Sequence, residues 1–443
     1  MEQYDLVVIG FGKAGKTLAG KMSAAGRKVA LVEENPAMFG GTCINIGCIP
    51  TKTLLVAADK NWTFEQVMEQ KETVTTRLRN KNEAVLKGSG ASLYQGHARF
   101  VADKVVEVSA GEESIQLTAE TIVINTGAKS RVLPIPGLLD PAHVYDSTGI
   151  QNLETRPNTL AIIGGGNIGL EFAGLYSKLG SQVTVYEASS AILPREEEVV
   201  AQLAKEYMEE AGVTFVLGAK IEQVAATGEQ VALTVNGESA VFDAVLYATG
   251  RVPNTADLGL ENTAIELLEN GAVKVDDYCE TTVPGVYAVG DVNGGPQFTY
   301  TSLDDFRIVF GKLTGTGTYS LSQRKSIPTS VFITPVLSRV GLTEREAKEA
   351  GYDYIANELP VANMPRAHVN NDLKGIFKVI VDKESKLILG ATLFGRNSEE
   401  LINLIAMAID NKIPYTYFKT QIFTHPTMAE NLNDVFILNK NQK

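Results

Sequence analysis

Residues 4–15 read YDLVVIGFGKAG and indicate the architecture of the chain. They begin with a short apolar run typical of a buried parallel strand, turn at three spaced glycines and continue into an apolar helical pattern. A second apolar run, KVALV at residues 28–32, ends at Glu33, which follows Gly10 by 23 positions. This order predicts a strand, a glycine-rich turn, a helix and a second strand that ends in an acid.

The same pattern returns later in the chain. Residues 160–169 read LAIIGGGNIG, and the run QVTVY at residues 182–186 ends at Glu187. Glu187 follows Gly164 by 23 positions, the same offset as in the first copy. The chain therefore carries an internal repeat of one supersecondary unit.

Each glycine of this pattern has a physical role in binding a dinucleotide. The first allows a tight turn, the second lets the backbone approach a pyrophosphate, and the third lets the helix pack closely on the strand. The helix N-terminus then faces the phosphates, and the acid accepts hydrogen bonds from ribose hydroxyls. One copy would be weak evidence, because glycine-rich turns are common, but two copies predict two dinucleotide sites. The alternative is a pair of structural turns with two surface glutamates.

The residues after Glu187 bear on which nicotinamide cofactor binds. They read ASS, without an arginine cluster. A 2′-phosphate would be repelled by Glu187 and would find no guanidinium, so the sequence favours NADH over NADPH. Arg195 is the residue that could reverse this preference.

Composition limits the class of protein. The chain has 443 residues, about three domains at roughly 150 residues each. Its net charge of −12 opposes binding to nucleic acid or to anionic membranes. Three cysteines, an acidic start and no apolar stretch of about 18 residues predict a soluble cytoplasmic protein.

Two of the cysteines lie in residues 40–52, GGTCINIGCIPTK, before a helical run at 53–60. Cys43 and Cys48 are close enough in the chain to form a disulfide, and a helix N-terminus and Lys52 would both lower a thiolate pKa. A redox pair is favoured over inert buried thiols. We expect no metal site, because no histidine lies nearby and Cys279 has no companion ligand.

At this point the chain resembles the class I pyridine nucleotide–disulfide oxidoreductases, which include dihydrolipoamide dehydrogenase, glutathione reductase and mercuric reductase. The resemblance covers essentially the whole chain. Besides the cysteine segment, it is carried by GGGNIGLEFA (164–173), ATGRVPN (248–254), VPGVYAVGDV (283–292) and HPTMAE (425–430). Within the family, GFGKAGKT (10–17), SLDDFRIV (302–309) and FTHPTM (423–428) are most similar to the bacterial reactive-chlorine-resistance flavoproteins, a likeness that implies copper(II) reduction.

The resemblance implies an α/β fold with two Rossmann-like domains, the NAD domain being inserted in the FAD domain, and a C-terminal α+β dimerisation domain. The expected boundaries are 1–148 for the first part of the FAD domain, 149–252 for the NAD(P)H domain, 253–325 for the completion of the FAD domain and 326–443 for the interface domain.

It also implies the residues that hold the two cofactors. Those near FAD would be Gly10, Gly12, Gly15, Glu33, Gly41, Thr42, Lys52, Ala98, Thr126, Gly127, Asp291 and Thr299. Those near NADH would be Gly164, Gly166, Ile168, Glu187, Gly250 and Arg251.

The mechanism implied by the resemblance passes a hydride from NADH to the flavin, which then reduces a Cys43–Cys48 bridge. Cys48 would be the thiolate next to the flavin and Cys43 the thiol that meets the acceptor. Lys52 and Glu171 would form an ion pair beside the flavin, although Glu171 alone could equally be a carboxylate on a helix surface.

His425 is the candidate acid–base residue, because thiol–disulfide exchange needs a proton donor near neutral pH. Glu430 would hold the other ring nitrogen and raise the pKa of the ring. In the family this pair reaches the cysteines of the second subunit, so the resemblance implies a homodimer. The remaining histidines, His97, His143 and His368, are expected to be structural.

Three functions are compatible with these features. The first is an NADH-dependent reductase that passes electrons through FAD and the cysteines to a disulfide or an oxidising metal such as copper(II) or mercuric ion, in defence against oxidative or chlorine stress. The second is dihydrolipoamide dehydrogenase, which runs the same cycle in reverse. The third is a non-catalytic redox sensor, against which the His425–Glu430 pair argues because a switch needs no proton donor.

Overall fold

The computed structural model describes residues 1–438 and contains two compact units, each built from separate segments of the chain. Unit 1 comprises residues 1–133, 146–155 and 249–324, and unit 2 comprises residues 134–145, 156–248 and the chain from 325 onward. The expected start of the inserted domain, near residue 149, lies between residues 145 and 156, where the chain passes from unit 2 to unit 1 and back again. Strand β8 (Val144–Tyr145) pairs with a strand of unit 2 before the chain returns to unit 1.

Unit 1 is built on a seven-stranded sheet in the order β3-β2-β1-β6-β5-β4, with β17 paired to β6. Strands β3, β2, β1, β6 and β17 are parallel, and β4 and β5 extend the sheet antiparallel. Their bounds are β1 Glu2–Ile9, β2 Val29–Glu33, β3 Ser92–Gln95, β4 His97–Ala102, β5 Val105–Ala110, β6 Glu113–Ile124 and β17 Val286–Ala288. A separate antiparallel pair joins β7 (Ala128–Ser130) to β16 (Arg251–Pro253).

Strand β1 explains why the opening apolar run lacks a polar face. Leu6 and Val8 belong to the core cluster that includes residues of α1, whereas Val7 and Ile9 belong to the core cluster on the other face of the sheet. A parallel strand covered on both faces reads as a continuous apolar run.

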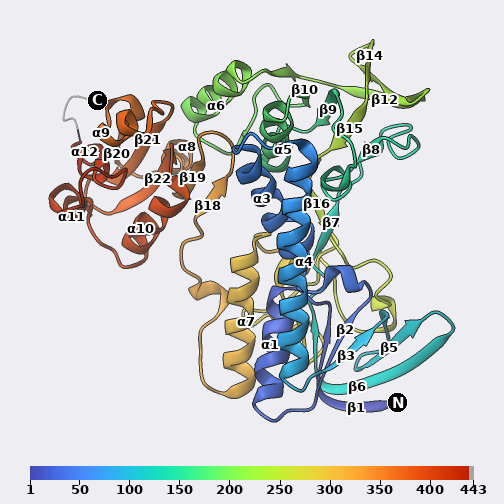
Figure 1. Cartoon of the computed structure of the whole chain (residues 1–443). Helices are drawn as coiled ribbons and strands as arrows, with labels where there is room; N and C mark the ends of the chain where they lie inside the picture. The colour runs from blue at the N-terminus through green and yellow to red at the C-terminus, as the bar shows by residue number, and fades with distance from the viewer. Residues whose placement is uncertain (439–443) are drawn as a thin grey trace. The chain divides into compact units, whose positions relative to one another are not determined.

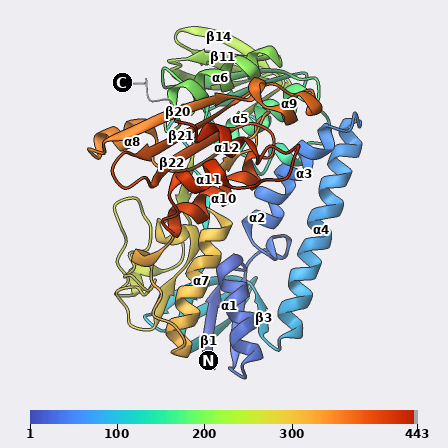
Figure 2. The same ribbon diagram turned by 90° about the vertical axis from the view of Figure 1, so that its left-hand side faces the viewer.

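The helices of unit 1 are α1 Lys13–Ala24, α2 Thr42–Asn45, α3 Cys48–Ala58, α4 Phe64–Gly88 and α7 Thr299–Thr314. Figures 1 and 2 show α7 beside α1, and α4 as the long helix of this unit. Helix α3 begins five residues before the predicted helical run, because Pro50 occupies its first turn, where a missing N–H costs nothing.

Unit 2 contains the second nucleotide-binding sheet, which is fully parallel and has the order β11-β10-β9-β15-β8. Its strands are β9 Thr159–Ile163, β10 Gln182–Glu187, β11 Val213–Leu217 and β15 Ala244–Tyr247, with helices α5 Asn167–Lys178 and α6 Glu198–Glu210. An antiparallel sheet follows, formed by β12 Ile221–Thr227, β13 Gln230–Val235 and β14 Glu238–Phe242.

The C-terminal part of unit 2 is an antiparallel sheet in the order β18-β19-β22-β21-β20. Its strands are β18 Thr329–Val331, β19 Leu337–Gly341, β20 Tyr354–Pro360, β21 Ile376–Asp382 and β22 Ile388–Phe394. Figure 2 shows this sheet with helices α10 and α12. The helices are α8 Glu344–Glu349, α9 Pro365–Asn370, α10 Ser398–Asp410, α11 Tyr415–Thr420 and α12 Asn431–Val435.

Within residues 1–438, none of the helices combines the length and the apolar composition that crossing a bilayer requires.

Candidate active site

The two glycine-rich turns share one hydrogen bond, in which the acid at the end of the second strand accepts from a backbone N–H of the turn. Glu33 Oε2 accepts from the backbone N–H of Phe11 at 2.9 Å, and Glu187 Oε2 accepts from that of Gly165 at 2.7 Å. Phe11 and Gly165 are the residues between the first two glycines of each copy. Each carboxylate is thus held against its own turn, and burial raises the pKa of Glu33.

The glycines themselves show what each turn must leave open. A side chain on Gly41, which has a φ of +84°, would begin 2.8 Å from the Gly12 Cα, so these two backbones touch. At Gly166, by contrast, a Cβ would meet nothing within 4 Å. That open space allows a ligand to approach the backbone of the turn.

Asn125 was not identified from the sequence, and it organises the first turn. Its Oδ1 accepts from the Gly15 N–H at 2.8 Å, and its Nδ2 donates to the Val289 carbonyl at 2.7 Å. The signal available in the sequence was the pair of endings NTG (125–127) and ATG (248–250), in which only the first copy has an amide.

The residues expected around FAD fit a pyrophosphate and a ribityl chain. Gly127 has a φ of +71°, and its missing Cβ would lie 4.0 Å from Thr42 Oγ1, so Gly12, Gly41, Thr42 and Gly127 line one cradle. Burial raises the pKa of Asp291, while Arg251 lowers it.

Other residues expected near the cofactors take several positions. Ala98 is buried in β4, and Thr126 donates to the Asn254 carbonyl at 2.7 Å. Ile168 lies in the first turn of α5, and Gly250 lies directly before β16. The cofactor role of each remains a prediction.

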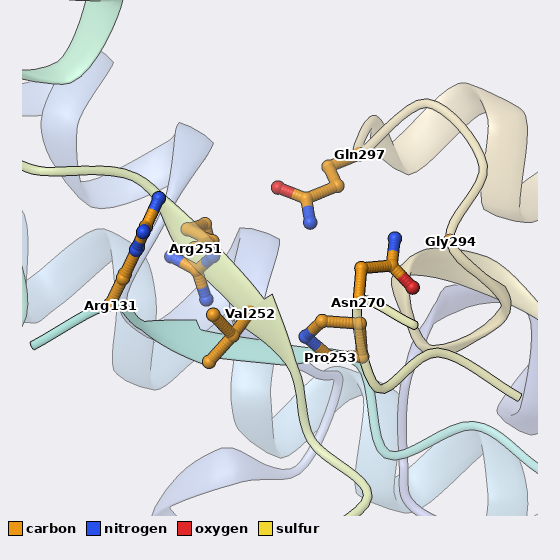
Figure 3. A pocket seen from close by; sticks show the side chains of 7 residues that line it. All are labelled: Arg131, Arg251, Val252, Pro253, Asn270, Gly294 and Gln297. Carbon is orange, nitrogen blue, oxygen red and sulfur yellow. The ribbon is translucent and has the colours of Figure 1, made fainter. Parts of the chain in front are cut away.

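A cavity of about 350 Å³ in unit 1 lies beside Arg251 (Figure 3). Its lining residues are Arg131, Arg251, Val252, Pro253, Asn270, Gly294 and Gln297. Arg251 Nη2 donates to the Ala128 carbonyl at 2.6 Å, and its buried Nε has no hydrogen-bond partner. Two guanidinium groups and two amides, with no carboxylate among the lining residues, suit an anionic group such as a cofactor phosphate.

The cysteine pair lies where two short helices meet. Cys43 belongs to α2, and Cys48 is the first residue of α3. Both are free thiols in this structure, with Cys48 the more exposed. Thr299, the first residue of α7, places its Oγ1 3.6 Å from Cys48 Sγ.

The two thiols have opposite titration behaviour. The hydrogen bond from Cys43 lowers the pKa of Cys48 from its ordinary 9.0 to about 6; desolvation opposes this shift, and Thr299 and Lys52 support it. The same Cys43–Cys48 hydrogen bond, followed by burial, raises the pKa of Cys43. Near neutral pH the reduced pair therefore carries one negative charge, on Cys48.

Lys52 and Glu171 lie in different units, and their expected ion pair remains a prediction. Lys52 is on α3 and Glu171 on α5. Glu171 is only 6% exposed, and its Oε1 accepts from the Phe332 N–H at 3.0 Å. The alternative of a carboxylate on a helix surface is therefore wrong.

His425 and Glu430 form the hydrogen-bonded pair that their spacing suggested. The distance from His425 Nδ1 to Glu430 Oε2 is 2.7 Å, and the His425 side chain is 70% exposed. Glu430 Oε1 also accepts from the Thr427 N–H at 3.2 Å, which fixes the carboxylate. The ring can therefore exchange protons through Nε2 with a molecule that approaches this surface.

The remaining histidines and Cys279 have local partners or are buried. His97 pairs with Glu34 at 3.0 Å, His143 lies 3.4 Å from the Tyr145 hydroxyl, and His368 lies 2.9 Å from the Ala362 carbonyl. Cys279 is fully buried. Across residues 1–438, no three His, Cys, Asp or Glu side chains are grouped so as to hold a metal ion.

Two family models match this chain. Residues 4–305 match the model described as pyridine nucleotide-disulphide oxidoreductase, and residues 327–436 match the dimerisation domain of the same family. The first match covers both glycine-rich turns and the cysteine pair. The second covers His425 and Glu430 and supports a homodimer.

Individual proteins agree with this assignment. The probable pyridine nucleotide-disulfide oxidoreductase RclA of Escherichia coli K12 is 46% identical over 441 residues, which are 99% of this chain and 100% of that protein. A dihydrolipoyl dehydrogenase of Geobacillus stearothermophilus is 33% identical and covers 96% of this chain, which spans 94% of that enzyme. A solved structure of E. coli RclA, described as a Cu(II) complex of an HOCl-induced flavoprotein disulfide reductase, superposes with a TM-score of 0.96 at 46% identity and covers 98% of this chain and 99% of its own.

These matches confirm the predicted α/β fold with Rossmann-like domains and the predicted use of FAD and a pyridine nucleotide. They also confirm the resemblance to reactive-chlorine flavoproteins. The chain belongs to the pyridine nucleotide-disulphide oxidoreductase family and is an FAD-dependent oxidoreductase.

Proposed function

We propose that this protein is a cytoplasmic NADH-dependent flavoprotein reductase whose Cys43–Cys48 pair delivers electrons to copper(II) or to a small disulfide, in defence against reactive chlorine. The observation that carries the proposal is the asymmetry of the pair. Cys48 is stabilised as a thiolate by Cys43, Thr299 and Lys52, whereas Cys43 is kept protonated. Inert thiols would have no need of this arrangement.

The chain's own groups favour NADH as the electron source. FAD, when bound, supplies a two-electron carrier between the nicotinamide and the cysteine pair. The Glu187 carboxylate lies beside the second glycine turn, where its oxygens accept from Gly165 at 2.7 Å and from Ser189 at 2.8 Å. Such a carboxylate accepts hydrogen bonds from ribose hydroxyls and repels a 2′-phosphate.

With a disulfide acceptor, the cysteines act by exchange. Cys43 first gives up its proton to His425 of a second copy, and the Cys43 thiolate then attacks one acceptor sulfur, which forms a mixed disulfide and releases one thiolate. Cys48 then attacks Cys43, so that the Cys43–Cys48 bond forms and the second acceptor thiolate leaves. The protons of the released thiols come from Cys43 and from solvent, through Nε2 of His425 of a second copy, whose ring Glu430 holds in place.

With copper(II), each sulfur of the pair gives up one electron. Two copper(II) ions become copper(I), Cys43 and Cys48 form a disulfide, and the remaining thiol proton leaves to His425 or to water. Copper(II) is favoured as the acceptor because RclA, to which this chain is 46% identical, has been solved as a Cu(II) complex.

The reverse reaction, oxidation of dihydrolipoamide, is the second candidate. The observation in its favour is the 33% identity to a dihydrolipoyl dehydrogenase over 96% of the chain. Both functions use the same two cysteines, so only the acceptor distinguishes them.

The test is anaerobic NADH oxidation by the flavin-loaded protein with copper(II), mercuric ion, glutathione disulfide or lipoamide as acceptor. We expect turnover with copper(II) or a small disulfide, and its loss in Cys43→Ser and Cys48→Ser with flavin retained. Cys279→Ser is the matched control, because Cys279 is a free thiol buried in the hydrophobic core. Turnover that survives in both active-site variants would overturn the proposal, and fast turnover with lipoamide alone would favour the second candidate.

A further inference from the structure

The Thr299 hydroxyl lies within hydrogen-bonding distance of the Cys48 sulfur and favours negative charge on both active-site sulfurs. Its Oγ1 lies 3.6 Å from Cys48 Sγ, although 251 positions separate the two residues. The same hydroxyl is also the first group that opposes the rise in the pKa of Cys43, so it favours negative charge on that sulfur as well. One rotatable O–H therefore favours negative charge on two sulfurs that carry this charge at different times.

The backbone on both sides of Thr299 is held firmly. The rings of Phe298 and Tyr300 stack with centroids 5.0 Å apart and an interplanar angle of 8°. Thr301 Oγ1 donates to the Pro296 carbonyl at 2.6 Å and accepts from the Phe298 N–H at 3.3 Å. Because a β-branched side chain is also stiff at χ1, the Thr299 oxygen has a defined position while its proton remains free to rotate.

We propose that Thr299 is a positioning residue that donates its hydroxyl proton to whichever of Cys43 and Cys48 carries the negative charge of the reduced pair. The inference rests on the proposed dithiol function, because it concerns the state in which both sulfurs are reduced. A thiolate has no proton to give, so the hydroxyl must be the donor, and hydrogen bonds to charged groups are the stronger ones. When charge moves from Cys48 to Cys43 for attack on an acceptor, the donor follows by rotation alone.

The other charged and titratable groups near the pair in unit 1 do not favour charge on both sulfurs. Lys52, on α3, favours charge on Cys48. Lys16, on α1, lies near Cys43, and burial lowers its pKa to about 8. Burial, and then the charge of Cys48, raises the pKa of Tyr300, so this phenol stays neutral. Lys52 and Lys16 each favour charge on one sulfur, whereas Thr299 favours charge on both.

The test compares Thr299→Val, which keeps the shape and removes the hydroxyl, with Thr299→Ser, which keeps the hydroxyl. The flavin-loaded protein is reduced with dithiothreitol and alkylated with iodoacetamide across a range of pH, and mass spectrometry assigns the label to each cysteine. We expect the Cys48 midpoint, near 6 in the parent, to rise by about one pH unit in Thr299→Val, a tenfold loss of thiolate below the midpoint. Thr299→Ser should match the parent.

Thr314→Val is the control, because Thr314 ends the same helix, is exposed and donates to the Phe310 carbonyl at 2.7 Å. It should leave the profile unchanged. Thr299→Ala serves as a second hydroxyl-free variant if Val displaces the flavin.

Equal midpoints in the parent and in a flavin-retaining hydroxyl-free variant would overturn the proposal, as would a Thr299→Ser profile that matches Thr299→Val. Alkylation needs no acceptor and no turnover. A failure of the proposed function, seen as turnover without the cysteines, is therefore distinguishable from a failure of this inference.

Discussion

The carboxylate of Asp305 accepts a hydrogen bond of 2.6 Å from the backbone N–H of Gly290, and this bond ties helix α7 to the turn that carries Asp291. Asp305 is 2% exposed and also accepts from Asn293 Nδ2 at 3.2 Å. Arg324 pairs with its other oxygen and balances the buried charge. Helix α7 therefore links the turn beside the expected ribityl site to Thr299 at the cysteine pair.

We expect Asp305→Asn to lower the free energy of unfolding by about 3 kcal/mol and to weaken flavin retention, because an amide cannot satisfy Gly290 and Arg324 together. Urea unfolding and the fluorescence of released flavin measure the two effects. Asp304→Asn is the control: Asp304 accepts from Arg324 Nε at 2.8 Å and is 14% exposed. It should cost about 1 kcal/mol without loss of flavin. Full flavin retention in Asp305→Asn would contradict this role for the bond to Gly290.

Glu430→Gln should slow turnover with disulfide acceptors by about tenfold to a hundredfold, because an amide holds the ring of His425 less firmly than the carboxylate that contacts Nδ1 at 2.7 Å. The rate at which NADH bleaches the flavin should not change, and stopped-flow absorbance separates the two half-reactions. Glu34→Gln is the matched control, since Glu34 pairs with His97 at 3.0 Å on an exposed surface. An equal effect in both variants would argue against a catalytic role for Glu430.

The reduced protein should gain stability between about pH 6 and pH 9. The pKa of Cys48 is lowered from 9.0 to about 6, so the unfolded chain binds more protons in this window and stability rises with pH. Above about pH 9 the raised pKa of Cys43 reverses the sign, because the folded state then keeps a proton that the unfolded chain releases. The measurement is the difference in unfolding free energy between the parent and Cys48→Ser, both reduced. A difference that is flat from pH 6 to pH 9 would contradict the assignment of the thiolate.

Glu187→Gln should lower the preference for NADH over NADPH by about tenfold, because it removes the charge that repels a 2′-phosphate and keeps an oxygen for the Gly165 N–H. The ratio of kcat/KM values for the two nucleotides is the readout. Glu33→Gln changes the matching residue of the first copy and should leave this ratio unaltered while lowering the bound FAD. An unchanged ratio in Glu187→Gln would mean that another group selects the nucleotide.

Features that depend on residues close together in the chain were predictable. Each glycine-rich turn and its acid lie within one strand–helix–strand unit, and Cys43 and Cys48 lie within six residues of each other. His425 and Glu430 are likewise separated by a single turn of chain, and their hydrogen bond follows from that spacing. Local geometry leaves such pairs few alternatives.

Contacts between distant parts of the chain were not predictable. Asn125 bonds Val289, Thr299 reaches Cys48, and Asp305 holds Gly290 against Arg324. Glu171 is buried against Phe332, although its helical context reads equally well as a surface.

The amino-acid sequence alone thus determined two dinucleotide-binding units, a closely spaced cysteine pair and a histidine–glutamate pair, because each is encoded by spacing within a single supersecondary element. Only the tertiary structure decided which groups surround the two sulfurs. The physical reason is that electrostatic and hydrogen-bonding environments are set by neighbours in space, and here those neighbours come from helices α1, α3 and α7, which chain order does not bring together.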